Sequence, residues 1–199
     1  MCVPLSLSDL SERRSAPVAQ LGAPGPDRPT LLRCIKAAIR VPDHGKLVPF
    51  RLIEIPSAAR DALGEALARR HKELEPDVAP KVLDKDRTRF SFAPTVVAVV
   101  ARVVESPKVP RLEQELTAGC VAFQLLQAVA AEGFAGNWLT GWAAYDPEVA
   151  RWFGLEPNEL IIGFVHIGTA RVDVPERERP DVTSLLSEFN PDSIYFTRD

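Results

Sequence analysis

The sequence is short of cysteine, of long hydrophobic runs and of any strong excess of charge. Three scattered cysteines, Cys2, Cys34 and Cys120, form no CxxC pair, which argues against a disulfide framework and a thiolate metal site. The longest apolar run, at 96–101, cannot span a bilayer, and the N-terminus lacks the apolar segment of a signal peptide. The net charge of -3, without a basic cluster, disfavours nucleic-acid binding. We therefore expect a cytoplasmic protein without membrane or nucleic-acid partners.

The composition is that of an ordinary globular domain. The 199 residues are 46% hydrophobic and 26% charged, which allows one sizeable core and favours neither disorder nor a membrane class. We expect a single domain over residues 1–199, with many of its 18 prolines at element boundaries. The charged, proline-rich tail at about 170–199 is expected to be extended and available for contacts with a partner subunit.

Hydrophobic periodicity predicts a mixture of helices and strands. Helices are expected at 8–14, 29–40, 57–74, 110–132 and 146–153, and strands at 50–55, 95–104 and 160–168. Residues 75–92 indicate a loop or an irregular helix, and the glycine-rich 133–141 indicates a turn. The β-branched run TVVAVVARVV should be buried on both faces of a sheet. Because the order is not a regular βαβ alternation, we predict an α+β fold with a small central sheet flanked by helices.

The predicted helix at 110–132 is apolar around much of its circumference. The apolar side chains at helical spacing along it are Leu112, Leu116, Cys120, Phe123, Leu126, Val129 and Ala130. We therefore expect this helix to be central and, with the tail, to supply a subunit interface. Glu113 and Glu115 in its first turn could form a catalytic carboxylate pair, but compensation of the helix dipole explains them better.

Three short segments carry residue types suited to binding. Arg13-Arg14-Ser15 could hold a phosphate through guanidinium groups and a hydroxyl, although a solvated helix end explains the segment better when it is taken alone. The loop 40–46 gathers four ionisable groups beside a glycine, and a polar turn explains it equally well. The turn 133–138 could present backbone amides and Trp138 to a planar cofactor, with core filling as the alternative. The histidines are too far apart in sequence to favour a metal site.

Taken in order, these segments resemble the nitroreductase family, in particular its short bacterial branch. The matching stretches are RRS at 13–15, IRVPDH at 39–44, KVPRLEQE at 108–115, AGC at 118–120, GFAGNW at 133–138 and IGFVHIGT at 162–169. Each motif is weak alone, but six in the same order and spacing are specific.

The resemblance implies an α+β fold whose two subunits intertwine, with one FMN at each of two interface sites. The cofactor-binding residues that it implies are Arg13, Arg14 and Ser15 at the FMN phosphate and ribityl chain, Arg40 and His44 at the flavin, and Asn137, Trp138 and Leu139 along the isoalloxazine ring. One of these segments is expected to come from the partner subunit.

The activity implied by the resemblance is hydride transfer from NADH or NADPH to a nitroaromatic, a quinone or a similar electrophile by a ping-pong mechanism. FMN itself would carry the chemistry. Two alternatives stay open: an FMN-binding store or sensor without turnover, and a flavin-dependent dehalogenase or dehydrogenase on the same fold. The chain departs from the family pattern at Val48-Pro49-Phe50, Leu139 and Ala170, where Gln-Pro-Trp, Arg and Pro are common. These departures bear on substrate choice and flavin potential.

Overall fold

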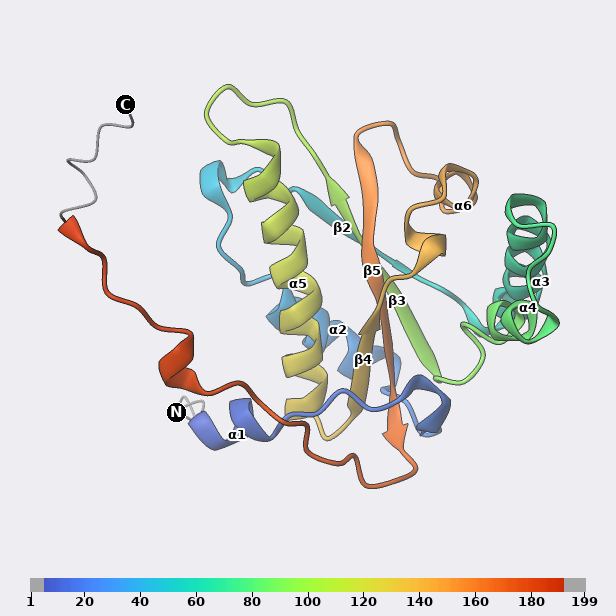
Figure 1. Cartoon of the computed structure of the whole chain (residues 1–199), viewed down its shortest axis with the longest axis horizontal. Coiled ribbons are helices and arrows are strands. Elements are labelled where there is room, and N and C mark those ends of the chain that lie inside the picture. Colours follow the sequence, from blue (N-terminus) through green and yellow to red (C-terminus); the bar gives the residue numbers. More distant parts are fainter. Residues whose placement is uncertain (1–5, 192–199) are drawn as a thin grey trace.

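The computed structural model describes residues 6–191 and shows an antiparallel sheet enclosed by helices (Figure 1). The strands are β1 Leu21–Gly22, β2 Phe50–Glu54, β3 Thr95–Arg102, β4 Ala135–Leu139 and β5 Glu159–Ala170. The helices are α1 Leu7–Glu12, α2 Arg28–Ala38, α3 Ser57–Leu74, α4 Pro80–Arg87, α5 Arg111–Ala131 and α6 Pro147–Trp152. Within the described residues the sheet has the order β1-β5-β3-β2, and β4 also pairs with β5. The predicted α+β class and the small helix-flanked sheet are confirmed.

The central strand β3 separates two hydrophobic cores. It pairs antiparallel with β2 on one side and with β5 on the other. Because side chains alternate along a strand, the odd-numbered residues from Val97 to Ala101 pack against α2 and α5. The even-numbered residues from Val96 to Val100 pack in a second core with α3, α6 and the chain after α4. The prediction that this run is buried on both faces is therefore confirmed.

The long helix α5 buries a different face from the one its apolar pattern suggests. Its buried residues are Gln114, Thr117, Ala118, Val121, Ala122, Leu125, Leu126 and Val129. Leu112, Leu116 and Phe123 are 65%, 59% and 49% exposed, and Cys120 on the same side is also exposed. Ala118 and Ala122 let the helix lie close to the sheet, and Val121, Leu125, Leu126 and Val129 pack in the same core, whereas Leu112, Leu116, Cys120 and Phe123 are left outside. These four exposed residues form what we call the α5 stripe.

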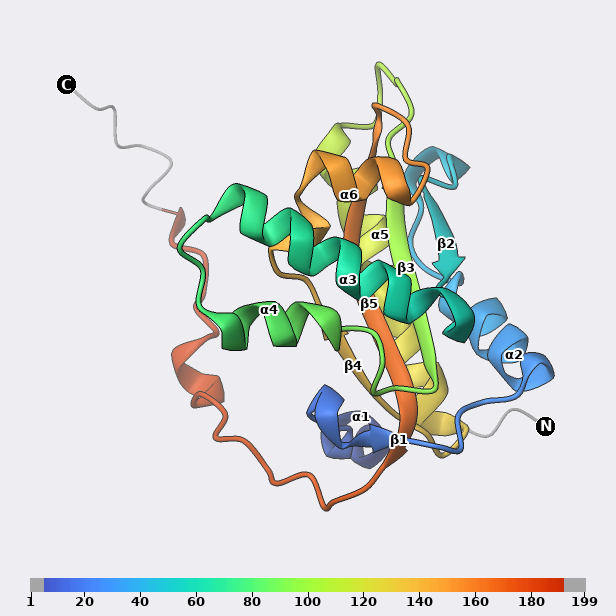
Figure 2. The same ribbon diagram turned by 90° about the vertical axis from the view of Figure 1, so that its right-hand side faces the viewer.

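The chain after α3 is more regular than its sequence predicts. Residues 80–87 form α4, which begins with a proline in its first turn, where proline is tolerated. Figure 2 shows α3 and α4 side by side over one face of the sheet, with α6 above them. The two helices approach closely at Gly64, where an added Cβ would lie 2.0 Å from the Arg87 carbonyl oxygen. The expectation of a loop or irregular helix is therefore wrong for these residues, because contacts with α3 stabilise α4.

The glycine-rich segment expected to be a turn is instead a strand over most of its length. After a turn at Gly133, with φ of 82°, β4 pairs antiparallel with the second half of β5. Gly136 is needed here because a Cβ would lie 2.9 Å from Leu126 Cδ2 on α5. The short strand β1, which also pairs with β5, was likewise not predicted. Both strands depend on pairing with a distant segment, which local pattern does not reveal.

Both ends of the chain leave the central body. Helix α1 ends at Glu12, so Arg13 and Arg14 follow it rather than close it as expected. The tail leaves β5, passes near α1 and then runs clear of the body (Figure 1). Between Arg171 and Asn190 the tail has no helix or strand apart from the short turn Val182–Ser184, and its last eight positions lie outside the described residues.

Candidate functional site

Two of the segments singled out in the sequence are neighbours in the fold. Ser15 forms a parallel bridge with Gly136 at the start of β4, and the Ala16 amide donates to the Gly136 carbonyl oxygen at 3.2 Å. The Asn137 side-chain amide donates to the Ala16 carbonyl oxygen at 2.7 Å. Asn137 thus holds the 13–16 segment against the sheet, in addition to any contact with a ligand.

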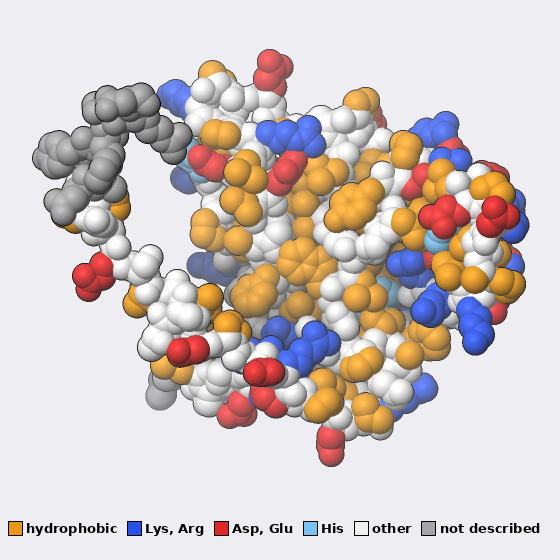
Figure 3. Space-filling view, in the orientation of Figure 1, with side chains coloured by type: hydrophobic (Ala, Val, Ile, Leu, Met, Phe, Trp, Pro, Cys, Tyr) orange, Lys and Arg blue, Asp and Glu red, His pale blue; other side chains and the backbone are white. Residues whose placement is uncertain are grey.

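Arg13, Arg14 and Ser15 line a small polar pocket that the tail completes. Its volume is about 120 Å³, and its lining residues are Arg13, Arg14, Ser15, Val174, Pro175, Arg177 and Arg179. We call it the arginine pocket. Figure 3 shows basic side chains gathered on this face where the tail passes α1.

The arginine pocket holds more positive charge than its acidic neighbour can balance. Glu176 forms an ion pair with Arg14 and lies 3.3 Å from Arg179 Nη2. Burial, together with the nearby guanidinium groups of Arg179 and Arg14, lowers the pKa of Arg13. A pocket lined by four arginines, of which only Arg14 and Arg179 pair with an acid within residues 6–191, is suited to an added anion, and phosphate matches guanidinium geometry well.

The sequence reasoning missed Arg177 and Arg179 in this pocket. They lie more than 160 positions from Arg13, in a segment without hydrophobic periodicity. The signal that could have drawn attention to them is the alternation of acid and base in the run ERER at 176–179. That run by itself is typical of a solvated tail, so the fold was needed to give it a role.

Trp138 is anchored within the protein. Its Nε1 donates to the Ile162 carbonyl oxygen at 3.2 Å, and its ring lies over Gly163, where an added Cβ would be 2.0 Å from Nε1. At the end of β4, Leu139 is 37% exposed and offers an apolar surface. The expected contacts of both residues with an isoalloxazine ring stay predictions, and the core-filling interpretation of Trp138 holds in part.

Arg40 and His44 lie at the opposite end of α5 from the arginine pocket. Arg40 is exposed just beyond α2, and His44 begins the short turn His44–Lys46. The His44 Nδ1 atom lies 2.8 Å from Glu113 Oε2 in the first turn of α5. By contrast, Ser15 contacts Gly136, which follows the last turn of α5.

The predicted site residues therefore form two groups within one protomer. The 21 residues of α5 separate them, and a helix of that length spans about 30 Å. One small ligand cannot contact both groups of the same chain. If both groups bind one ligand, one of them must come from a second copy of the chain.

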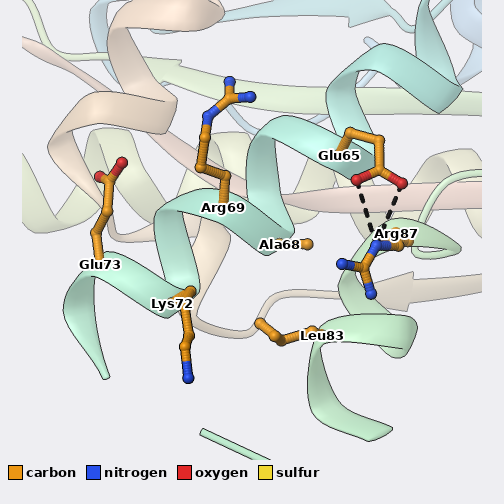
Figure 4. Close-up of a pocket in the computed structure, with 7 residues that line it drawn as sticks. All are labelled: Glu65, Ala68, Arg69, Lys72, Glu73, Leu83 and Arg87. Atoms are coloured by element: carbon orange, nitrogen blue, oxygen red, sulfur yellow. Dashed lines mark hydrogen bonds and ion pairs between the residues drawn. The ribbon is translucent and has the colours of Figure 1, made fainter. Parts of the chain in front are cut away.

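A larger pocket lies between α3 and α4, away from both groups (Figure 4). Its volume is about 420 Å³, and its lining residues are Glu65, Ala68, Arg69, Lys72, Glu73, Leu83 and Arg87. Glu65 and Arg87 neutralise each other at 3.2 Å, and Glu73 pairs with Arg70. The mixed charge and the lack of a nucleophile or imidazole make this pocket a poor candidate for chemistry.

Neither a membrane-spanning helix nor a metal-binding cluster occurs within residues 6–191. No helix there is long and apolar enough to cross a membrane. In the same part of the chain, no three histidine, cysteine, aspartate or glutamate side chains are grouped so that they could hold a metal ion.

Residues 11–169 match the model of the nitroreductase family, so the chain belongs to that family of oxidoreductases. The "Putative NAD(P)H nitroreductase YdjA" of Escherichia coli (strain K12) is 32% identical over 185 residues, which cover 92% of this chain and 99% of that protein. A "Putative NAD(P)H nitroreductase" of Haemophilus influenzae is 34% identical over 174 residues, which cover 87% of this chain and 92% of that protein.

Solved structures show the same fold. A nitroreductase-like family protein from Bacillus cereus aligns with a TM-score of 0.75 at 18% identity, covering 95% of this chain and 98% of the other. The FMN and NADPH-dependent nitroreductase NfnB from sphigopyxis sp. strain HMH aligns with a TM-score of 0.73 at 19% identity, covering 94% of this chain and 100% of the other. The nitroreductase fold predicted from the motifs is therefore confirmed.

Proposed function

We propose that this chain is an FMN-dependent oxidoreductase that passes hydride from NADH or NADPH to a nitroaromatic, a quinone or a similar electrophile in a ping-pong cycle. The observation that carries the proposal is the arginine pocket, which four arginines line and in which Glu176 pairs with two of them, Arg14 and Arg179. The names of the relatives, which refer to NAD(P)H and in the case of NfnB to FMN, support it.

The arginine pocket fits the phosphate of FMN. A phosphate monoester brings close to two negative charges at neutral pH, which would balance the excess of guanidinium groups. Arg13 and Arg14 would hold its oxygens with their paired N–H groups, and the Ser15 hydroxyl would add a third contact. Arg177 and Arg179 would close the site from the tail. The pocket is too small for more than the phosphate end, so the rest of the cofactor would lie along β4.

Each residue group has a separate task in this proposal. Residues 136–139 of β4 would support the flavin ring next to the phosphate, with Asn137 keeping the 13–16 segment in place. Arg40 and His44 of the partner subunit would approach the ring from the other side. Bound FMN supplies the centre that accepts and donates hydride, while the protein binds and orients it.

Purified protein is expected to bind FMN and to oxidise NADH or NADPH when a quinone is present. The spectrum should be that of a flavoprotein, and denaturation should release FMN rather than FAD, because the pocket accepts a terminal phosphate. The measurements are absorbance, chromatography of the released flavin and steady-state NAD(P)H oxidation. Flavin binding without turnover would favour the store or sensor, and failure to take up added FMN would contradict the proposal altogether.

We further propose that the chain acts as a homodimer in which α5 and the tail form the interface. The α5 stripe is an apolar surface that no other part of residues 6–191 covers, and hydrophobic side chains gather over the same face in Figure 3. The tail carries the similarly exposed side chains Val182, Leu185, Leu186 and Phe189, which are 70–81% exposed. Pairing two copies would cover these surfaces and bring the two groups of site residues together.

Charged substitutions in the α5 stripe are expected to convert the dimer to monomers and to abolish FMN retention. Leu116→Asp combined with Phe123→Asp would bury two unpaired charges in an obligate interface, which typically covers roughly 2,000 Å² or more. Light scattering at micromolar concentration measures the effect. Tyr145→Asp is the control, because Tyr145 is 72% exposed outside the stripe. A wild-type monomer would refute the dimer.

A further inference from the structure

The pair formed by His44 and Glu113 is unlike the surroundings of the other two histidines. His71 is buried against Asp86, with its Nδ1 2.5 Å from the Asp86 Oδ2. His166 is fully buried in β5. The His44 side chain is 60% exposed, its Nδ1 is 2.8 Å from the Glu113 Oε2, and among the described residues its Nε2 has no hydrogen-bond partner. It is therefore the one imidazole that can exchange protons with a ligand and with water.

The loop that carries His44 is held in a conformation that costs energy. Lys46 and the β-branched Val48 have φ of 52° and 49°, in the left-handed region that side chains rarely adopt. The Asp43 carboxylate accepts hydrogen bonds from the Leu47 and Val48 amides at 3.0 and 2.9 Å. Such strain persists where the surroundings enforce it and is common at functional sites.

The same loop is tied to α5 at two points. The Thr117 hydroxyl donates to the Pro42 carbonyl oxygen at 3.0 Å, and Glu113 binds the His44 ring one turn earlier on the helix. A carboxylate on Nδ1 fixes the orientation of the ring and directs Nε2 outward. Leu116, a member of the α5 stripe, lies beside the pair in an apolar pocket of about 210 Å³. The pair thus stands at the rim of the proposed interface, where the partner's flavin would lie.

From this geometry we infer that Glu113 positions His44 and that protonated His44 delivers the proton that accompanies hydride to the acceptor. The inference rests on the proposed function. Two-electron reduction of a quinone takes up one hydride and one proton. The bound cofactor would supply the hydride, and the proton would leave His44 Nε2 for the acceptor oxygen. His44 is then neutral and regains a proton from water, to which it is open. Glu113 is the charged group that contacts the ring, and Asp43 and Lys46 are its charged neighbours in the loop.

The test compares an acceptor that needs a proton with one that does not. Ferricyanide takes up a single electron and no proton, whereas benzoquinone takes up the equivalent of a hydride together with a proton. Oxidation of the reduced holoenzyme by each acceptor is followed in a stopped-flow instrument. In Glu113→Gln and His44→Gln, the ratio of the quinone rate to the ferricyanide rate should fall at least roughly tenfold, within the range of general acid catalysis. Added imidazole should partly restore the quinone rate of His44→Ala.

A matched control and a readout without turnover complete the test. Glu115→Gln removes the carboxylate that pairs with Arg111 at 2.5 Å on the same helix, and it should leave the ratio unchanged. In the apoprotein, the ¹⁵N signals of the His44 ring should change in Glu113→Gln but not in Glu115→Gln, because only Glu113 accepts from Nδ1. The inference would be overturned if the rates with benzoquinone and ferricyanide fell equally, or if the ratio of the two rates did not change. If the wild-type protein does not reduce ferricyanide, the proposed function is wrong. The inference, which rests on that function, is then wrong as well.

Discussion

Replacing Arg13 and Arg14 together with alanine is expected to weaken FMN binding by roughly two to four orders of magnitude, since each lost charge-assisted bond contributes about 1.5–3 kcal/mol. Stability of the apoprotein should hardly change, or should rise slightly, because burial and the nearby guanidinium groups of Arg179 and Arg14 already lower the pKa of Arg13. The measurements are the FMN dissociation constant by fluorescence quenching and the melting temperature of the apoprotein.

Conservative substitutions at the same positions, and the removal of arginines elsewhere, distinguish specific phosphate binding from a general effect of net charge. Lysine at both positions keeps the charge but removes the paired N–H groups, so binding should recover only in part. Arg87→Ala with Arg151→Ala removes the same charge from α4 and α6, where each arginine pairs with a surface acid, and should leave FMN affinity unchanged. Alanine at Arg177 or Arg179 should also weaken binding. If the FMN dissociation constant is unchanged when Arg13 and Arg14 are both replaced by alanine, the two arginines do not bind the phosphate and are only a solvated chain end.

Acidification from pH 7.5 to pH 4 is expected to remove about 3 kcal/mol of stability through His166 alone. This side chain is fully buried in β5, and its ring stacks on Phe90 with the ring centroids 5.9 Å apart. Neither ring nitrogen has a hydrogen-bond partner among the described residues. Burial, with the charges of Arg89 and Arg60, lowers the pKa of His166 to about 4. Between the ordinary pKa of about 6.5 and this value the unfolded chain binds a proton that the folded protein does not, so stability rises with pH through that window.

His166→Leu should remove most of this pH dependence. Leucine keeps an apolar side chain of similar size but binds no proton, so the free energy of unfolding should fall much less between pH 7.5 and 4. Phe164→Leu, two positions earlier on the same strand face, is the control: it should lower stability by a similar amount at both pH values, because it creates a cavity without changing protonation. Urea unfolding at fixed protein concentration gives the comparison. If the free energy of unfolding depends on pH in the same way in the wild type and in His166→Leu, His166 is not the source of the pH dependence.

A second buried polar group, Asp86, limits the pH range in which the effect of His166 on stability can be measured separately. Burial alone would raise the pKa of Asp86, but hydrogen bonds from Arg89, His71 and Trp142 outweigh burial and lower it. A carboxyl with a depressed pKa begins to lose its contribution as the pH falls through its ordinary pKa, and loses the rest as the pH falls through the folded value. The comparison for His166 therefore belongs above pH 4, where Asp86 stays ionised in both proteins.

The sequence by itself determined the class of fold and the family. The doubly buried run TVVAVVARVV placed a central strand, and helical periodicity located α2, α3 and α5, because these signals depend on short-range spacing alone. The order of six weak motifs was enough to indicate the family, which the match over residues 11–169 confirms. The residue types of Arg13-Arg14-Ser15 already suited a phosphate.

Only the tertiary structure decided how these pieces combine. Pairing with β5 made a strand of the glycine-rich segment, and contact with α3 made a helix of residues 80–87. The fold brought Arg177 and Arg179 to Arg13 across the length of the chain, and it turned the α5 stripe outward. It also separated His44 from the arginine pocket by the length of α5 and joined it to Glu113. Each of these outcomes depends on contacts between residues distant in sequence, whose partners no local pattern can specify.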